Sequence, residues 1–76
     1  MKKIEVGDIV AWKWANGIAE GVVEDIIYDK TSIESKGSIV TRKGSLDNPA
    51  VIISHKSGNL VLKLQSELQI ISGDKV

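Results

Sequence analysis

The fold is decided by the stretch VGDIVAWKWANGIAEGVVEDIIY, residues 6–28 of a 76-residue chain. This stretch holds both tryptophans and the single tyrosine, and the chain has no phenylalanine. Trp12, Trp14 and Tyr28 are therefore the only large rings that a core or a ligand surface can use. How the three rings divide between core and surface determines what the protein can bind.

Two antiparallel strands are predicted within this stretch. Ile9 to Trp14 is too short and too rich in β-branched residues for a helix, and turn residues flank it at Gly7-Asp8 and Ala15-Asn16-Gly17. Ile18 to Tyr28 follows as a longer strand, in which Gly21 predicts a bulge or a sharp bend. Such a bend would let the second strand serve two sides of a small barrel.

Strict alternation assigns the faces of both strands. The first strand presents Val10, Trp12 and Trp14 together. The second strand has two apolar faces, with Ile18, Val22 and Ile26 on one and Ala19, Val23 and Ile27 on the other.

The composition indicates one small domain over residues 1–76, with 42% hydrophobic residues. Ten basic and ten acidic residues cancel, so no overall field draws the chain to nucleic acid or to an anionic membrane. There is no cysteine, and we expect neither disulfides, nor a metal site, nor a cofactor. Met1-Lys2-Lys3 resembles the start of a secretory leader, but Glu5 and Asp8 interrupt the apolar run, which favours the cytoplasm and no membrane segment.

The middle of the chain allows two interpretations after a tight turn at residues 29–31. Either short strands at 32–34 and 39–41 flank a turn at 35–38, or residues 31–41 form one strand kinked at Gly37. Residues 42–49 concentrate Gly, Ser, Asp, Asn and Pro, which predicts a loop.

The last third predicts a hairpin and a closing strand. Ala50 to Ser54 and Leu60 to Leu64 are strands around a turn at residues 56–59, with Leu60, Leu62 and Leu64 facing inward and Val61 and Lys63 outward. A 3₁₀ turn at residues 65–68 precedes Ile70-Ile71, which would close the sheet. The pattern as a whole predicts an all-β fold, a small five-stranded SH3-like (Tudor-like) barrel with one short 3₁₀ turn near the C-terminus.

Four sequence pieces resemble the hypervirulence-associated Tudor domain family. They are GD-x-V-x-W at residues 7–12, G-x-A-x-G at 17–21, RKGS-x-DNPA at 42–50, and VLK followed by SEL at 61–68. The resemblance covers the chain from Val6 to Leu68. It implies a Tudor-like, SH3-type barrel of the kind found in short stand-alone proteins, and it names no ligand.

The rings suggest one candidate site. Trp12, Trp14 and Tyr28, with Glu24 or Asp25 nearby, would form an aromatic cage for a methylated Lys or Arg side chain. The competing interpretation, which we favour, is that at least one tryptophan fills the core.

The 42–48 loop suggests a second candidate site, for an anion, built from Arg42, Lys43, Ser45, Asp47 and Asn48. Alternatively the two cations are solvated and pair with Asp47 or a nearby acid, while Asp47 and Asn48 fix a turn. His55 is interpreted as a surface residue at a strand end, with no companions for a metal or a catalytic triad.

The sequence therefore predicts a non-enzymatic interaction module without catalytic residues, which binds a peptide or protein partner through the first hairpin and the 42–48 loop. The alternative is weak nucleic-acid binding through local basic residues: Lys2, Lys3, Lys13, Lys36, Arg42, Lys43, Lys56 and Lys63. A monomer is favoured, and a dimer through an exposed strand edge stays open.

Overall fold

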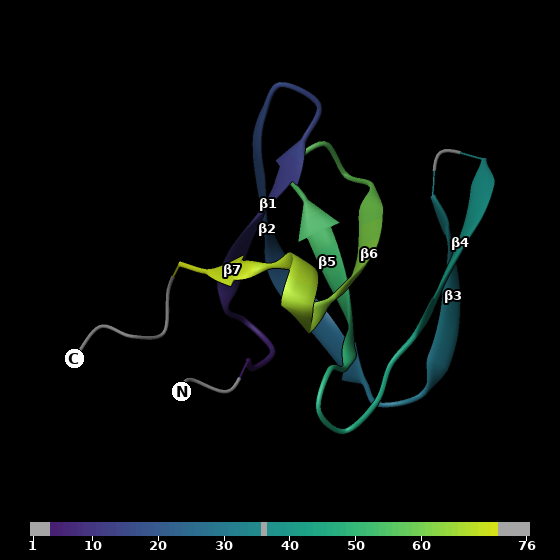
Figure 1. The fold of residues 1–76 in the computed structure, drawn as a ribbon. Coiled ribbons are helices and arrows are strands. Elements are labelled where there is room, and N and C mark those ends of the chain that lie inside the picture. Colours follow the sequence, from purple (N-terminus) through teal and green to yellow (C-terminus); the bar gives the residue numbers. More distant parts are fainter. Residues whose placement is uncertain (1–3, 36, 72–76) are drawn as a thin grey trace.

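The computed structural model describes residues 4–35 and 37–71, which form seven strands and one 3₁₀ turn (Figure 1). In chain order these are β1 Ile9–Trp14, β2 Gly17–Ile27, β3 Lys30–Ser35, β4 Ser38–Lys43, β5 Ala50–His55, β6 Leu60–Leu64, the 3₁₀ turn η1 Gln65–Glu67 and β7 Gln69–Ile70. Within these ranges no helix is long and apolar enough to cross a membrane.

The strands form two antiparallel sheets. One has five strands in the order β6-β5-β2-β1-β7, and the other is the β3–β4 hairpin, which stands beside β6 (Figure 1). The predicted all-β class and the late 3₁₀ turn are confirmed. The five-stranded barrel is wrong on two points, because there are seven strands and the described sheets do not close. β7 is only two residues long and pairs with β1 alone, so it cannot reach across to β6.

Among the described residues, side chains and not a further strand supply hydrogen-bond partners at the open edge of β6. The Gln65 N–H donates to the Pro49 carbonyl, which continues the β5–β6 ladder, and alternation then turns the backbone groups of Leu60, Leu62 and Leu64 away from β5. The Ser35 hydroxyl donates to the Leu60 carbonyl at 2.8 Å, and the Leu64 N–H donates to Glu67 at 2.8 Å. The β3–β4 hairpin and η1 therefore supply partners at an edge that would otherwise be free to pair with another chain.

The two interpretations of residues 31–41 are resolved in favour of separate strands. Ser35 pairs with Ser38 across a tight turn in which Gly37 has a φ of 81°, a conformation that suits glycine. Both strands are longer than predicted, so Arg42 and Lys43 belong to β4 and the loop begins at Gly44. Lys36 lies outside the described residues.

The bend in β2 does not occur at Gly21. Gly21 pairs regularly with Val10 on one side and His55 on the other, and the register shifts between Val23 and Asp25. The glycine serves close packing, because a Cβ at Gly21 would lie 2.5 Å from the Ile53 side chain.

The bulge adds one residue to β2, so the side chains after it point to the opposite face from the one that strict alternation predicts. Val23 and Ile26 both pack in the core, whereas Ile18 and Val22 are exposed. The predicted grouping of Ile26 with Ile18 and Val22 is therefore wrong.

The core lies on the face of the main sheet that carries Trp12, and its buried members are Ile4, Val10, Trp12, Val23, Val51 and Ile53. The prediction that at least one tryptophan fills the core is confirmed, since Trp12 is only 5% exposed. In β6, Leu62 is buried as predicted. Leu60 is exposed and Val61 packs against the core, so their predicted orientations are wrong.

Candidate binding groove

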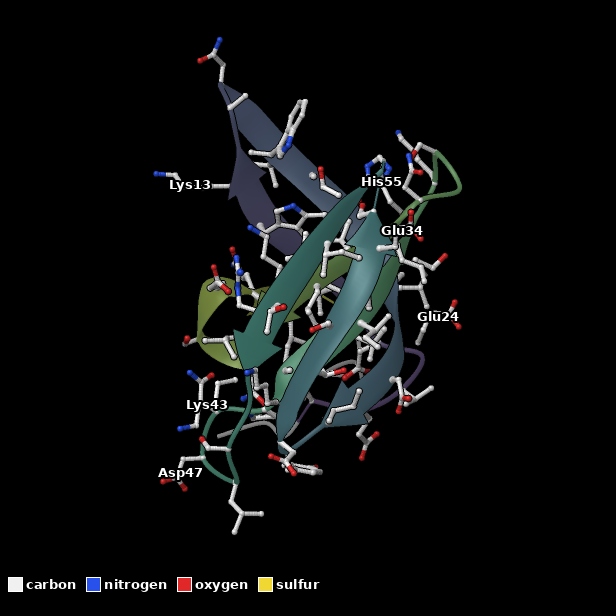
Figure 2. The ribbon with its side chains drawn as sticks, turned by 90° about the vertical axis from the view of Figure 1, so that its right-hand side faces the viewer. Lys13, Glu24, Glu34, Lys43, Asp47 and His55 are labelled. Carbon is white, nitrogen blue, oxygen red and sulfur yellow. The ribbon has the colours of Figure 1, made fainter. Side chains whose placement is uncertain are left out.

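A groove of about 400 Å³ lies between the main sheet and the β3–β4 hairpin. The tryptophans of β1 and the β5–β6 turn form one side, and the inner face of the hairpin forms the other. Figure 2 looks onto this hairpin, with His55 near one end of the molecule and Lys43 and Asp47 near the other. The volume is within the range of ligand pockets.

The two tryptophans have different roles in the groove. Trp12 is packed in the core and meets His55 edge to face, with ring centroids 6.2 Å apart and planes at 61°. Trp14, two residues along β1, is 62% exposed and lines the groove. Alternation alone would bury both, but β1 extends beyond the core at its Trp14 end, where its partner is Gly17. Trp14 therefore offers a free ring face to a ligand.

His55 was not recognised as a groove residue from the sequence. It is half-buried at the end of β5, and its Nδ1 accepts a hydrogen bond from the Ser57 N–H at 3.1 Å. The Asn59 amide in turn donates to the Ser57 hydroxyl, at 3.2 Å. These bonds fix the turn that walls one end of the groove. The alternation of Val51, Ile53 and His55 was the available signal, because it puts His55 on the core face.

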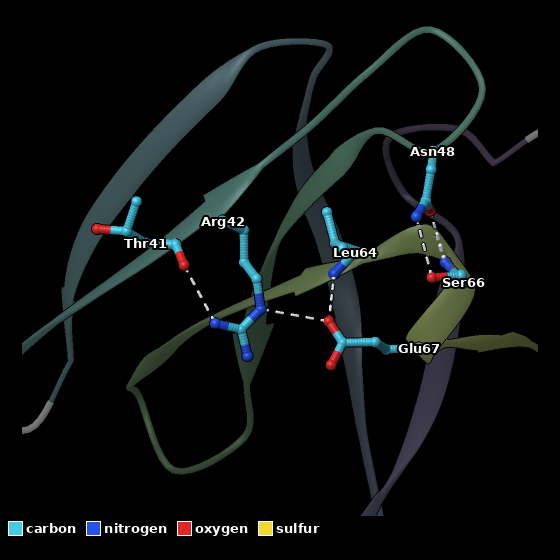
Figure 3. A network of polar contacts seen from close by, with 6 residues as sticks. All are labelled: Thr41, Arg42, Asn48, Leu64, Ser66 and Glu67. Atoms are coloured by element: carbon cyan, nitrogen blue, oxygen red, sulfur yellow. Dashed lines mark hydrogen bonds and ion pairs between the residues drawn. The ribbon is translucent and has the colours of Figure 1, made fainter.

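Arg42 is the cation of the predicted loop site that lines the groove. Its Nε donates to Glu67 Oε1 at 3.3 Å and its Nη1 to the Thr41 carbonyl at 3.1 Å (Figure 3). Partial burial raises the pKa of Glu67, but the hydrogen bond from Leu64 and the hydrogen bond and charge of Arg42 outweigh it. The pKa of Glu67 therefore lies below its usual value of 4.5.

Of the predicted site residues, the groove brings together Trp12, Trp14 and Arg42. Tyr28 follows the far end of β2, roughly 30 Å along the strand from Gly17 at the usual rise per residue. It does not line the groove, so the described structure does not assemble the three rings into a cage. Lys43, Ser45, Asp47 and Asn48 also lie outside the groove lining.

The family model described as "Hypervirulence associated proteins TUDOR domain" matches residues 7–68. The chain belongs to this family. Searches of curated proteins and of solved structures give no match. The strand order and the single 3₁₀ turn are consistent with a Tudor-like fold, and the family is one of small interaction modules.

Two stretches of this Tudor domain that resemble the family pattern contact each other. The Asn48 side chain accepts a hydrogen bond from the Ser66 N–H at 2.9 Å and donates to the Ser66 hydroxyl at 3.1 Å (Figure 3). The Ser45 hydroxyl accepts from the Asn48 N–H at 3.1 Å. Asn48 thus satisfies a free N–H of η1 from a distant loop, whereas the predicted role was to fix a turn of its own loop together with Asp47. Arg42 pairs with Glu67 and not with Asp47.

We expect Glu67→Gln to weaken the domain at neutral pH and to remove part of its acid sensitivity. The folded-state pKa of Glu67 is lowered, so its contribution is present above the unfolded pKa and is lost as pH falls through the folded pKa. The side chain is 36% exposed, and solvent screening limits the effect to less than about 1 kcal/mol. Urea unfolding at about pH 7 and about pH 3 measures it.

Glu20→Gln, at an exposed position of β2, is the matched control for this experiment. The difference between wild type and Glu67→Gln should shrink at acid pH, whereas Glu20→Gln should follow the wild type. A Glu67→Gln deficit that is equal at both pH values would contradict the ion-pair explanation.

Proposed function

We propose that this Tudor domain is a non-enzymatic interaction module that binds a peptide or protein partner in the groove between the first hairpin and the β3–β4 hairpin. The observation that carries the proposal is the exposed Trp14 ring at the edge of a groove with an apolar floor. Exposed tryptophans beside well-packed pockets are typical anchors of protein interfaces. Ala19, Val40 and Val61 supply further apolar lining.

The rest of the predicted surface contributes less to the proposed site. Ser45 and Asn48 have their polar groups engaged with each other and with Ser66, so they are poor ligands for a partner. Lys43 is on the exposed face of β4. The proposed binding surface therefore includes the first hairpin and Arg42 and excludes the loop that follows Lys43.

Nucleic-acid binding, the alternative, finds less support. Of the described basic residues, Arg42 and Lys63 line the groove, whereas Lys13 lines a separate, smaller hollow beside η1. Cations on different faces cannot follow one phosphate backbone, and the net charge is zero.

Selection from a random peptide library displayed against the whole domain tests the proposal, with Trp14→Ala as the diagnostic variant. We expect selected peptides to shift the Trp14 indole N–H resonance and to bind Trp14→Ala at least about tenfold more weakly. The fold should survive this change because the ring is exposed. Tyr28→Ala removes the other exposed ring and should leave affinity unchanged. Failure to select any binder, or binders indifferent to Trp14→Ala, would reject the proposal.

A further inference from the structure

The ionisable residues that line the groove are all basic or histidine. They are Arg42 from β4, His55 from β5 and Lys63 from β6. No Asp or Glu among the described residues lines the groove, although the whole chain has as many acids as bases. On β3, Glu34 alternates with the half-buried Ile33 and Ser35 and is exposed on the outer face of the hairpin. Because side chains alternate between the two faces of the hairpin, the acidic side chain of β3 points away from the groove, and the lining is basic although the chain as a whole is neutral.

The groove lining has two permanent positive charges, on Arg42 and Lys63, and Glu67 neutralises only one of them. It forms its ion pair with Arg42, and Lys63 also acts on it through space and lowers its pKa. Lys63 itself forms no ion pair with any residue in the described ranges. Two cations share one carboxylate, and one positive charge remains for a ligand.

The same lining disfavours a cationic ligand. A methylated lysine gains from several ring faces around the cation. Here the Trp12 ring is packed against His55, so Trp14 alone has a free face, and Arg42 and Lys63 would repel the incoming charge.

We propose that the groove takes an acidic peptide segment, with an apolar side chain against Trp14 and a carboxylate facing Lys63. The charge complementarity of an acid-free, basic lining is the argument for this occupant. Val40 and Val61 line the groove beside these charges. A bare anion would leave this apolar surface uncovered, so we expect the ligand to carry an apolar group as well. The inference rests on the proposed function, whose groove it uses, and adds the chemistry of the partner.

The Trp14-dependent peptides from the random library are the probe. We expect them to be enriched in Asp and Glu over Lys and Arg, and to keep an apolar residue. Lys63→Glu should weaken their binding about tenfold and reduce its salt dependence. Lys43→Glu is the matched control, since it makes the same charge change on the exposed outer face of β4 and should leave binding within about twofold.

The outcomes separate this inference from the proposed function. Trp14-dependent binders that are neutral or basic, or that tolerate Lys63→Glu, overturn the acidic-partner inference and leave the groove as a binding site. Binders that ignore Trp14, or no binders, overturn both. An oligothymidylate or a trimethyl-lysine peptide that binds the groove more tightly than the selected peptides also overturns the acidic-partner inference.

Discussion

Gly44→Ala is expected to destabilise the domain by at least about 3 kcal/mol. Gly44 is buried where the loop leaves β4, and an added Cβ would lie 2.5 Å from the Ile27 carbonyl oxygen and 2.7 Å from the Ala50 nitrogen. Both are backbone atoms, so no side chain can rotate away. The Gly44 N–H also donates to the Asp29 carbonyl at 3.0 Å, and separating the segments would weaken that bond.

Such a loss is large for this chain. A 76-residue domain has a stability of roughly 4–11 kcal/mol at the usual contribution per residue. Urea unfolding should therefore show a greatly lowered midpoint, or no folded baseline. Gly17→Ala is the matched control, because a Cβ added at Gly17 would meet nothing within 4 Å and Gly17 has no positive φ. Equal losses from the two variants would show that the close backbone approach at Gly44 is not what requires glycine.

The limits of the sequence prediction lie in pairing over long distances. The alternation of β-branched residues and the turn residues placed β1, β5 and β6 within a residue of their observed bounds. The bulge near Glu24 could not be predicted, because it depends on how β5 pairs along β2. The close packing of Gly21 depends on Ile53, which is far away in sequence, so a glycine chosen for space was interpreted as a bend.

The candidate site was predictable only where local sequence determines it. Trp14 and Arg42 were identified from their types, and the structure brings them into one groove. The pairing of Arg42 with Glu67 and of Asn48 with Ser66 spans 25 and 18 residues, respectively, and no local pattern indicates it. Tyr28 was grouped with the tryptophans because it is the third large ring of the chain and belongs to the partner strand, but the length of that strand separates it from them in space.

Ile53→Ala is expected to cost about 2–5 kcal/mol, because Ile53 is fully buried at the centre of the core and neighbouring strands prevent collapse of the cavity. Ile53 pairs with Val23 on β2 and Val61 on β6, and its side chain fills the space above Gly21. The chain has no phenylalanine and Trp12 is the one tryptophan in the core, so branched aliphatic residues supply most of the remaining packing.

Ile53→Val, which removes one methyl group, should cost only about 0.5–1.5 kcal/mol. Ile18→Ala makes the same truncation at a strand position that is 65% exposed and should cost less than about 1 kcal/mol. Urea unfolding of the three variants, with unchanged m-values, measures the series. A loss for Ile18→Ala as large as that for Ile53→Ala would mean that the core lies on the other face of the sheet, and the groove beside Trp12 would then have no fixed floor.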